Sequence, residues 1–130
     1  MSAGFTAEQL IQAAIEARRN AYAPYSGFLV GAAVCDEQGQ IHSGCNVENA
    51  SYGLTICAER VAICKAVSLG RRRFVALAVA TEGGHAPCGA CRQFIAEFAK
   101  ELPIYLIDAV TAEVSTVQIE ELLPRRFDFS

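Results

Sequence analysis

The sequence predicts an α/β protein, a three-layer α-β-α sandwich with a mixed five-stranded sheet. Helical stretches and short apolar runs follow one another in the order α-β-β-α-β-α-β-β-α, an order in which helices cover both faces of a sheet. The link from Asp108 to Ala112 is too short for a crossover helix, so the strands on either side of it are expected to pair antiparallel. The 130 residues are expected to form one domain, residues 1–130, with a substantial core.

The N-terminal half is expected to contain one helix and a pair of strands. Thr6-Ala7-Glu8-Gln9 is typical of a capping box, and apolar residues behind it recur at helical spacing, which predicts a helix over 7–19. Residues 22–27 contain proline and glycine and are expected to form a loop. Strands are predicted at 29–35 and 40–46, joined by a tight turn.

The C-terminal half is expected to contain three helices and three strands. Gly70 is expected to stop the first of these helices, since glycine readily takes the left-handed conformation found after helix ends. The predicted elements are helix 57–69, strand 74–80, helix 88–100, strand 103–107, strand 113–117 and a short helix at 119–122.

The composition and charge exclude some classes of function. Hydrophobic residues make up 52% of the chain, and the net charge of −3 argues against a nucleic-acid polymer as partner, because such binding usually leaves a basic footprint. Arg71-Arg72-Arg73 is the one basic run. It leaves a nucleic-acid patch open, but cations after a helix more often serve its dipole and the solubility of the chain.

The expected compartment is the cytoplasm, with no membrane segment. Met1-Ser2-Ala3-Gly4 lacks the basic and apolar regions of a secretory signal, and no apolar stretch approaches the roughly 18 residues of a membrane span. Cytoplasmic thiols stay reduced, so the even number of six cysteines is not expected to indicate a disulfide framework. Cys35, Cys45 and Cys64 are expected to be small buried apolar residues.

Three other cysteines, in two short motifs, predict a metal site. Cys57 opens the predicted helix 57–69, while Cys88 and Cys91 open the next helix, and helix N-termini stabilise thiolates. Three thiolates can hold zinc and leave its fourth position open to water, as in catalytic sites. Two alternatives stay open: His85 could complete a closed structural site, and the Cys-x-x-Cys pair could be redox-active.

The charge of such a site indicates which neighbours it needs. Zinc and three thiolates sum to −1, a charge that hinders ionisation of bound water. Helix N-termini and hydrogen bonds from Arg60 would draw charge from the sulfurs, with Arg92 as a second candidate and a surface ion pair as the alternative for Arg60. Glu59, two residues after the first cysteine, is placed to move protons at that water.

Asn46 and Glu48 form a further pair of polar residues. They lie two apart, so in extended chain they face the same side, and an amide beside a carboxylate suits hydroxyl groups. The alternative is a solvated strand end that caps a turn. The spacing alone favours neither interpretation.

Four motifs together resemble a known family. They are Pro24–Ala33, Gly44–Ala50, Cys57–Arg60 and Pro87–Gln93. In this order they resemble the small, zinc-dependent, homotetrameric class of cytidine deaminases over nearly the whole chain. The resemblance implies hydrolytic deamination of cytidine and 2′-deoxycytidine to uridine and 2′-deoxyuridine, with release of ammonia, by attack of zinc-bound hydroxide on C4. The alternative is a deaminase of another small aminopyrimidine nucleoside, such as a nucleoside antibiotic.

The resemblance also implies roles for residues at the metal. It makes Cys57, Cys88 and Cys91 the ligands of one zinc ion per subunit. Glu59 is then the general acid and base that shuttles protons, and Arg60 tempers the thiolate charge. The rival without this resemblance is a non-enzymatic zinc or redox domain.

The implied substrate contacts come from one subunit and its neighbours. Within one subunit, Asn46 and Glu48 would hold a ribose hydroxyl, Phe28 would pack on the pyrimidine, and Ala58 backbone groups would read the edge of the base. In a homotetramer with shared active sites, the remaining contacts would cross an interface, with Ala50 and Tyr52 near the 5′ end of the sugar and Phe127 over another subunit's base.

The C-terminal tail departs from the pattern of the family. The usual tail is Leu-Leu-Pro, two small residues and Phe, whereas this chain has Arg125 and Arg126 at the two small positions. Their bulk and charge bear directly on how Phe127 is placed.

Overall fold

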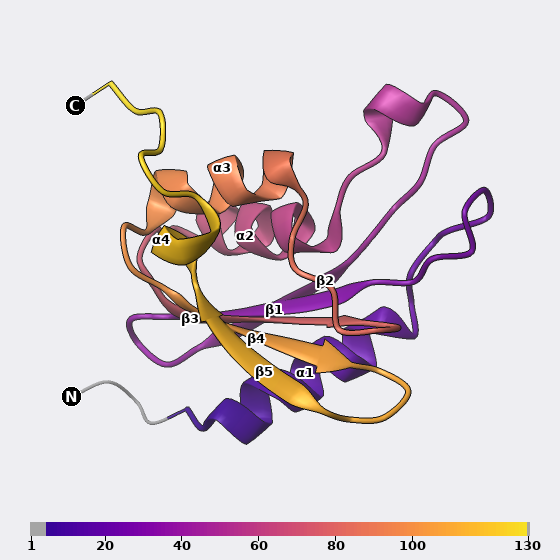
Figure 1. The fold of residues 1–130 in the computed structure, drawn as a ribbon, viewed down its shortest axis with the longest axis horizontal. Helices are drawn as coiled ribbons and strands as arrows, with labels where there is room; N and C mark the ends of the chain where they lie inside the picture. The colour runs from indigo at the N-terminus through magenta and orange to yellow at the C-terminus, as the bar shows by residue number, and fades with distance from the viewer. Residues whose placement is uncertain (1–4, 130) are drawn as a thin grey trace.

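Helices cover both faces of a five-stranded sheet in the computed structural model, which describes residues 5–129 (Figure 1). The strand order is β2-β1-β3-β4-β5; β3 and β4 run parallel, and the other three neighbouring pairs are antiparallel. The predicted three-layer sandwich with a mixed sheet is therefore confirmed, including the antiparallel pairing of the last two strands. Met1–Gly4, where no secretory signal is expected, lies outside the described residues.

The elements follow the predicted order. The helices are α1 Ala7–Arg18, α2 Ala58–Ser68, α3 Gly89–Phe98 and α4 Ile119–Leu122, and the strands are β1 Gly31–Asp36, β2 Ile41–Cys45, β3 Phe74–Thr81, β4 Pro103–Asp108 and β5 Val114–Gln118. One further element, the short 3₁₀ helix η1 Tyr52–Leu54, is not predicted by any sequence pattern. In the described chain no helix is long and apolar enough to cross a lipid bilayer.

Two predicted boundaries were wrong for identifiable reasons. The first strand begins at Gly31, not at residue 29, because the Asn46 side chain takes the Phe28 carbonyl and the Val30 N–H that a strand ladder would use. Helix α3 ends at Phe98, not near residue 100, because the backbone turns extended at the next residue.

Helix α1 covers one face of the sheet. Thr6 and Gln9 form the predicted capping box, with both of its hydrogen bonds at 3.1 Å. Behind the cap, Leu10 and Ala14 are fully buried against small residues of β1 and β3. The helix lies so close that a Cβ at Gly31 would stand 2.0 Å from the Ala14 carbonyl oxygen, so only glycine fits there.

Helices α2 and α3 cover the opposite face with a larger core. Alternate residues of the central strands point to this side, as a period of two requires, and they pack on Ala62, Ile63 and Ile95 of the two helices. Gly70, at φ +86°, ends α2 in the left-handed conformation as predicted. This packing aligns α2 and α3 so that both begin near the C-terminal end of the central strand β3.

Cys64 does not share this burial, contrary to prediction. Cys35 is fully buried, and burial raises the pKa of its thiol to about 11, whereas Cys45 is half-buried and Cys64 is exposed. On α2 the buried side is set by Ala62, Ile63 and Ala66, and position 64 falls outside it. The prediction therefore holds for Cys35 alone.

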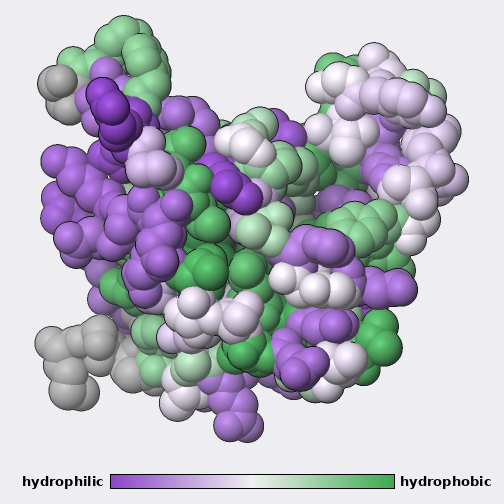
Figure 2. Space-filling view, viewed as in Figure 1, coloured by the Kyte–Doolittle hydropathy of each residue, from purple (hydrophilic) through white to green (hydrophobic). Residues whose placement is uncertain are grey.

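Two segments rise from the body of the molecule as separate projections (Figure 2). One is the arm, residues 47–56, which carries η1 and is closed at its base by a bridge between Val47 and Ile56. Tyr52 and Leu54 on the arm are 76% and 65% exposed. The other projection is the tail, residues 123–129, at the end of the chain.

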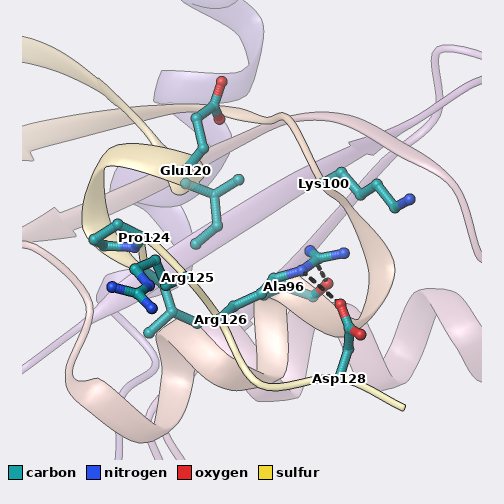
Figure 3. Close-up of a pocket in the computed structure, with 9 residues that line it drawn as sticks. Ala96, Lys100, Glu120, Pro124, Arg125, Arg126 and Asp128 are labelled. Carbon is teal, nitrogen blue, oxygen red and sulfur yellow. Dashed lines mark hydrogen bonds and ion pairs between the residues drawn. The ribbon is translucent and has the colours of Figure 1, made fainter. Parts of the chain in front are cut away.

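Arg126 fixes the tail to the end of helix α3 (Figure 3). One of its terminal nitrogens donates hydrogen bonds to the carbonyls of Ala96 at 2.7 Å and Ala99 at 3.2 Å, and its Nε lies 3.5 Å from the Asp128 carboxylate. Carbonyls at a helix C-terminus lack partners within the helix, and a guanidinium is well suited to supply one. Arg125, the other arginine at a position that is usually small, has a left-handed backbone conformation at φ +54° just before Arg126.

Candidate active site

The N-termini of α2 and α3 bring the three predicted cysteines together. Cys57 and Cys88 are the residues that cap these two helices, and Cys91 lies in the first turn of α3. Their sulfur atoms all lie within 4.8 Å of one another. Within the described residues this is the one group of three or more metal-binding side chains, and His85 is not part of it. Three thiols without a fourth protein ligand fit a zinc ion with an open position.

The thiols are not electrostatically equivalent. A hydrogen bond from Cys91, together with the Arg60 guanidinium, lowers the pKa of Cys57 to about 5. The same hydrogen bond and burial raise the pKa of Cys91 far above its usual value. Of these two thiols Cys57 ionises first, and a bound metal ion would favour the thiolate form of its ligands.

Arg60 points back toward the cysteines. Its terminal nitrogen lies 3.6 Å from the Cys57 sulfur and 3.4 Å from the Thr55 carbonyl, while its buried Nε finds no partner among the described residues. The hydrogen bond to Cys57 raises the pKa of Arg60 above its usual value. No ion pair joins Arg60 to a carboxylate in residues 5–129, so the alternative of a surface ion pair is not seen. Arg92, the second candidate, instead donates to the carbonyls of Pro87 and Leu122.

Glu59 is buried beside the cysteines. Its side chain belongs to the first turn of α2, only 4% of the residue is exposed, and burial raises the pKa of its carboxyl to about 7. Its own backbone N–H and the charge of Arg60 oppose that shift without cancelling it. A carboxyl with a pKa near 7 can hold and release a proton at neutral pH, which is what a general acid and base needs.

A cavity of about 210 Å³ opens onto this corner. Six of the residues predicted from sequence to act at the site line it: Phe28, Asn46, Cys57, Ala58, Glu59 and Cys88. The other lining residues are Val30, Thr55, Val79, Thr81, His85 and Ala86. Glu59 is the only carboxylate among these twelve residues. The cavity is therefore mostly apolar, with a thiol cluster and a single acid at one end.

Comparison with known proteins places this arrangement in a family. Residues 5–106 match the family model described as the cytidine and deoxycytidylate deaminase zinc-binding region. A curated cytidine deaminase from Sporosarcina psychrophila is 50% identical over 123 residues, which cover 92% of this chain and 90% of that protein. The 1.6 Å crystal structure of cytidine deaminase from Burkholderia pseudomallei aligns with a TM-score of 0.90 at 48% identity, covering 95% of this chain and 100% of that one.

The chain belongs to the cytidine and deoxycytidylate deaminase family. The resemblance carried by the four sequence motifs is thereby confirmed, and zinc is the cofactor that fits the cysteine cluster. A more distant relative, blasticidin-S deaminase from Bacillus cereus, is 30% identical over 109 residues, covering 75% of this chain and 76% of that protein. The relatives of this chain thus include deaminases named for different substrates.

Asn46 and Glu48 both contact the loop before β1. The Asn46 amide donates to the Phe28 carbonyl at 2.8 Å and accepts from the Val30 N–H at 2.9 Å. Glu48 accepts hydrogen bonds from the Tyr25 and Ser26 N–H groups and from the Ser26 hydroxyl. The pair therefore holds this loop, in the manner of the capping alternative, while each side chain retains some capacity to bind a sugar hydroxyl.

Four predicted contact residues lie outside the cavity. Glu48 and Tyr52 line a neighbouring groove of about 410 Å³ with Tyr25, Ser26 and Thr55, while Ala50 is exposed at the start of the arm. Phe127 is 66% exposed and lies over α3, where Gln93 donates a hydrogen bond to its carbonyl. Within one chain these residues do not meet the substrate cavity.

Sequence reasoning missed several residues of the site. His85 was considered only as a metal ligand, yet its ring lies 6.1 Å from that of Phe28, centroid to centroid, at the rim of the cavity. Thr55 lines both the cavity and the neighbouring groove. Neither residue stands in a motif with a recognisable chemistry. Their roles depend on loops that only the fold brings together.

Proposed function

We propose that this protein hydrolyses cytidine and 2′-deoxycytidine to uridine and 2′-deoxyuridine with release of ammonia, in pyrimidine salvage. The observation that carries the proposal is geometric. The single carboxylate of the cavity, Glu59, lies beside three thiols that converge from two helix N-termini. The reaction needs a proton carrier of this kind next to a metal position open to water. The cytidine deaminase relatives support the choice of substrate.

We assign the roles at the metal to residues of α2 and α3. Cys57, Cys88 and Cys91 hold one zinc ion, which, when bound, acts as a Lewis acid that ionises water near neutral pH. Arg60 donates to the Cys57 sulfur and limits the negative charge of the ligand set. Glu59 takes one proton from water and delivers it to the ring nitrogen, then carries a second to the leaving amine. A C4–O bond forms, the C4–N bond breaks, and the ammonia leaves.

We assign the recognition of the nucleoside to the walls of the cavity. Phe28, 41% exposed at the rim, packs against the pyrimidine, and the backbone of Ala58 reads the edge of the base. Glu48 and Asn46 face the sugar from the adjoining side. The cavity, about 210 Å³, matches a single base, and the neighbouring groove offers room for the sugar.

The direct test is an ultraviolet assay of the zinc-loaded protein. Cytidine, 2′-deoxycytidine, cytosine and cytidine monophosphate would be offered separately, with zinc measured on the same sample. We expect turnover of both nucleosides and little of free cytosine, which lacks the sugar that Glu48 and Asn46 are proposed to hold. Stoichiometric zinc without nucleoside turnover would refute the proposed activity.

The alternative is a deaminase of another small aminopyrimidine nucleoside. It is favoured only by the 30% identity to blasticidin-S deaminase, against 50% to a cytidine deaminase. Offering blasticidin S in the same assay separates the two. Faster turnover of blasticidin S than of cytidine would favour the alternative.

We further propose that copies of the chain assemble, as a homotetramer, around shared sites in a reducing compartment such as the cytoplasm. The arm and the tail present Tyr52, Leu54 and Phe127, all at least 65% exposed, and burying such apolar side chains against another copy would be favourable. Ala50 and Tyr52 would then approach the sugar of a neighbour, and Phe127 its base. The six cysteines, free in the described chain, suit a compartment that keeps thiols reduced.

Subunit mixing tests the shared site. Phe127→Ala and Glu59→Gln chains would be denatured, mixed and refolded together. If Phe127 acts on a neighbouring subunit, mixed assemblies contain some sites with both native residues, and activity returns above that of either parent. Activity no higher than the sum of the parents would mean that Phe127 does not act across an interface.

A further inference from the structure

We propose that Ser26 is a positioning residue that links the sugar side of the site to the base side. Its hydroxyl donates to the Glu48 carboxylate and accepts from the backbone N–H of Phe28, so one side chain fixes both groups. The inference rests on the proposed function, because it assigns Glu48 and Phe28 to the two halves of a nucleoside. Ser26 itself has no part in the chemistry.

The contacts around Ser26 form one continuous chain. Oε1 of Glu48 accepts from the N–H groups of Tyr25 at 2.9 Å and Ser26 at 3.1 Å, while Oε2 accepts from the Ser26 hydroxyl. The oxygen of that hydroxyl then accepts from the Phe28 N–H at 3.0 Å. A displacement of the serine would therefore reach both the carboxylate and the aromatic ring.

The capacity of Glu48 shows what Ser26 controls. A carboxylate offers about four acceptor positions, two on each oxygen. The loop occupies both positions of Oε1 and one of Oε2, which leaves one position, on the oxygen that Ser26 holds. Glu48 is thus set to accept from one sugar hydroxyl, and Ser26 decides where that position points.

The surroundings place this link at the junction of two hollows. Glu48 and Ser26 line the groove of about 410 Å³, Phe28 lines the cavity of about 210 Å³, and Thr55 lines both. On the other side of the loop Asn46 holds the Phe28 carbonyl, so the backbone that carries the ring is held from two directions. Among residues 5–129, Ser26 is the one whose side chain hydrogen-bonds to both the Phe28 backbone and the Glu48 carboxylate.

The same contact favours the charged form of Glu48. The hydrogen bond from the Ser26 hydroxyl, more than those from the two N–H groups, lowers the pKa of Glu48. A charged acceptor binds a sugar hydroxyl more strongly than a neutral one. The tyrosines Tyr25 and Tyr52 are the other titratable groups of this groove.

The test compares two substrates that differ only in the hydroxyl groups at issue. Steady-state kinetics of zinc-loaded Ser26→Ala would be measured on cytidine and on 2′,3′-dideoxycytidine, which lacks the 2′- and 3′-hydroxyls of the sugar. We expect kcat/KM for cytidine to fall by about tenfold, mainly through KM. Without Ser26, the Glu48 carboxylate is no longer held where it accepts a hydrogen bond from the sugar hydroxyl, and a hydrogen bond to a charged group contributes about this much. For the dideoxynucleoside, which reports only the support that Ser26 gives to Phe28, we expect a smaller fall of about two- to threefold.

Three further variants make the test specific. Ser26→Thr keeps the hydroxyl and should restore most of the activity on cytidine. Ser68→Ala removes an exposed hydroxyl at the end of α2 and should change neither substrate. In a Glu48→Ala background, Ser26→Ala should add only the loss of about two- to threefold that comes through Phe28, because its effect through the carboxylate is already gone.

The outcomes separate this inference from the proposed function. An equal loss on both substrates, or no loss on cytidine, would overturn the role of Ser26 while the deaminase activity stands. A wild-type protein that carries zinc but deaminates neither nucleoside would overturn the proposed function and this inference with it. Thermal unfolding of each variant identifies any loss that comes from a less stable fold.

Discussion

Glu59 and Asp36 are two buried carboxyl groups whose pKa values move in opposite directions. Both residues are almost inaccessible, at 4% and 1% exposed. Burial raises the pKa of Glu59 to about 7, because the only hydrogen bond to its carboxylate in the described chain comes from its own backbone N–H. Burial would also raise the pKa of Asp36, but hydrogen bonds from His42, Gln40 and Gln38 outweigh it, and the net shift is downward.

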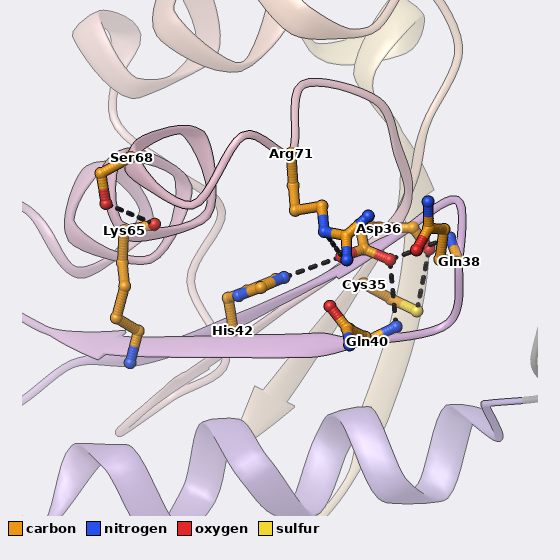
Figure 4. A network of polar contacts seen from close by, with 8 residues as sticks. All are labelled: Cys35, Asp36, Gln38, Gln40, His42, Lys65, Ser68 and Arg71. Atoms are coloured by element: carbon orange, nitrogen blue, oxygen red, sulfur yellow. Dashed lines mark hydrogen bonds and ion pairs between the residues drawn. The ribbon is translucent and has the colours of Figure 1, made fainter.

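Asp36 lies at the centre of a complete network at the turn between β1 and β2 (Figure 4). Its Oδ1 accepts from the N–H groups of Gln38 at 2.8 Å and Gln40 at 3.0 Å. Its Oδ2 lies 2.9 Å from Nε2 of His42 and 3.6 Å from Nε of Arg71. Arg71, the first residue of the basic run, therefore serves to hold the loop after α2 against the strand pair.

The hydrogen-bond donors around a buried carboxyl group distinguish a structural acid from a catalytic one. Each carboxylate oxygen of Asp36 has two partners that favour its charged form. Asp36 therefore stays ionised at neutral pH, and its function is to hold the turn. Glu59 is buried without such donors, faces a cavity and lies beside metal-binding thiols, so its proton is free to move. The following predictions test this distinction, beginning with the largest expected effect.

Replacing Cys57 removes the metal from the neighbourhood of Glu59. A Cys57→Ala chain should lose its zinc on dialysis and its activity with it, since two thiols make a much weaker site than three. Cys64→Ala, on the exposed side of the same helix, is the matched control and should keep both. Atomic absorption on purified protein measures the metal. A full zinc complement in Cys57→Ala would show that the ligand set is wrong.

Replacing Asp36 should affect stability and leave catalysis unchanged. An Asp36→Asn chain loses the charged acceptor of His42 and Arg71, which should lower the free energy of unfolding by about 1.5–3 kcal/mol. Urea titrations measure the change, and zinc-loaded kcat on cytidine should stay within about twofold. A large fall in kcat with normal stability would give Asp36 a functional role that the network does not predict.

The contribution of Asp36 should depend on pH with a definite sign. Because its folded pKa lies below the ordinary value of 3.8, the stabilisation is complete above that value and disappears as pH falls through the lowered pKa. The difference in unfolding free energy between wild type and Asp36→Asn should therefore be constant from about pH 7 to pH 5 and shrink toward about pH 3. A difference that grows on acidification would reverse the assigned sign.

Sequence patterns predicted the fold and the cysteine cluster because both depend on residues that are close together in the sequence. Helical and strand periodicity gave the element order, and residues two or three apart at helix starts placed Cys57, Glu59 and the Cys88–Cys91 pair. The missed features join residues far apart in sequence. Ser26 meets Glu48 across 22 positions and Arg126 meets Ala96 across 30, and no periodicity signals such contacts.

The conformations of the arm and the tail could not be predicted from the sequence either. Helix η1 and the tail have little burial within the chain, so no hydrophobic pattern predicts their conformation. Arginines replace the two small residues of the family's tail pattern. The structure explains Arg126, which donates hydrogen bonds to carbonyls at the end of α3. The strand boundary at Gly31 likewise depends on the Asn46 side chain.

Turnover of cytidine by zinc-loaded Glu59→Gln most directly tests the central claim, that a lone buried carboxyl beside three metal-binding thiols carries the protons of the reaction. The change keeps size and shape, so fold and zinc content should match wild type, while kcat should fall about 10²- to 10⁴-fold. A Glu59→Gln protein with full zinc and near wild-type kcat would contradict the account.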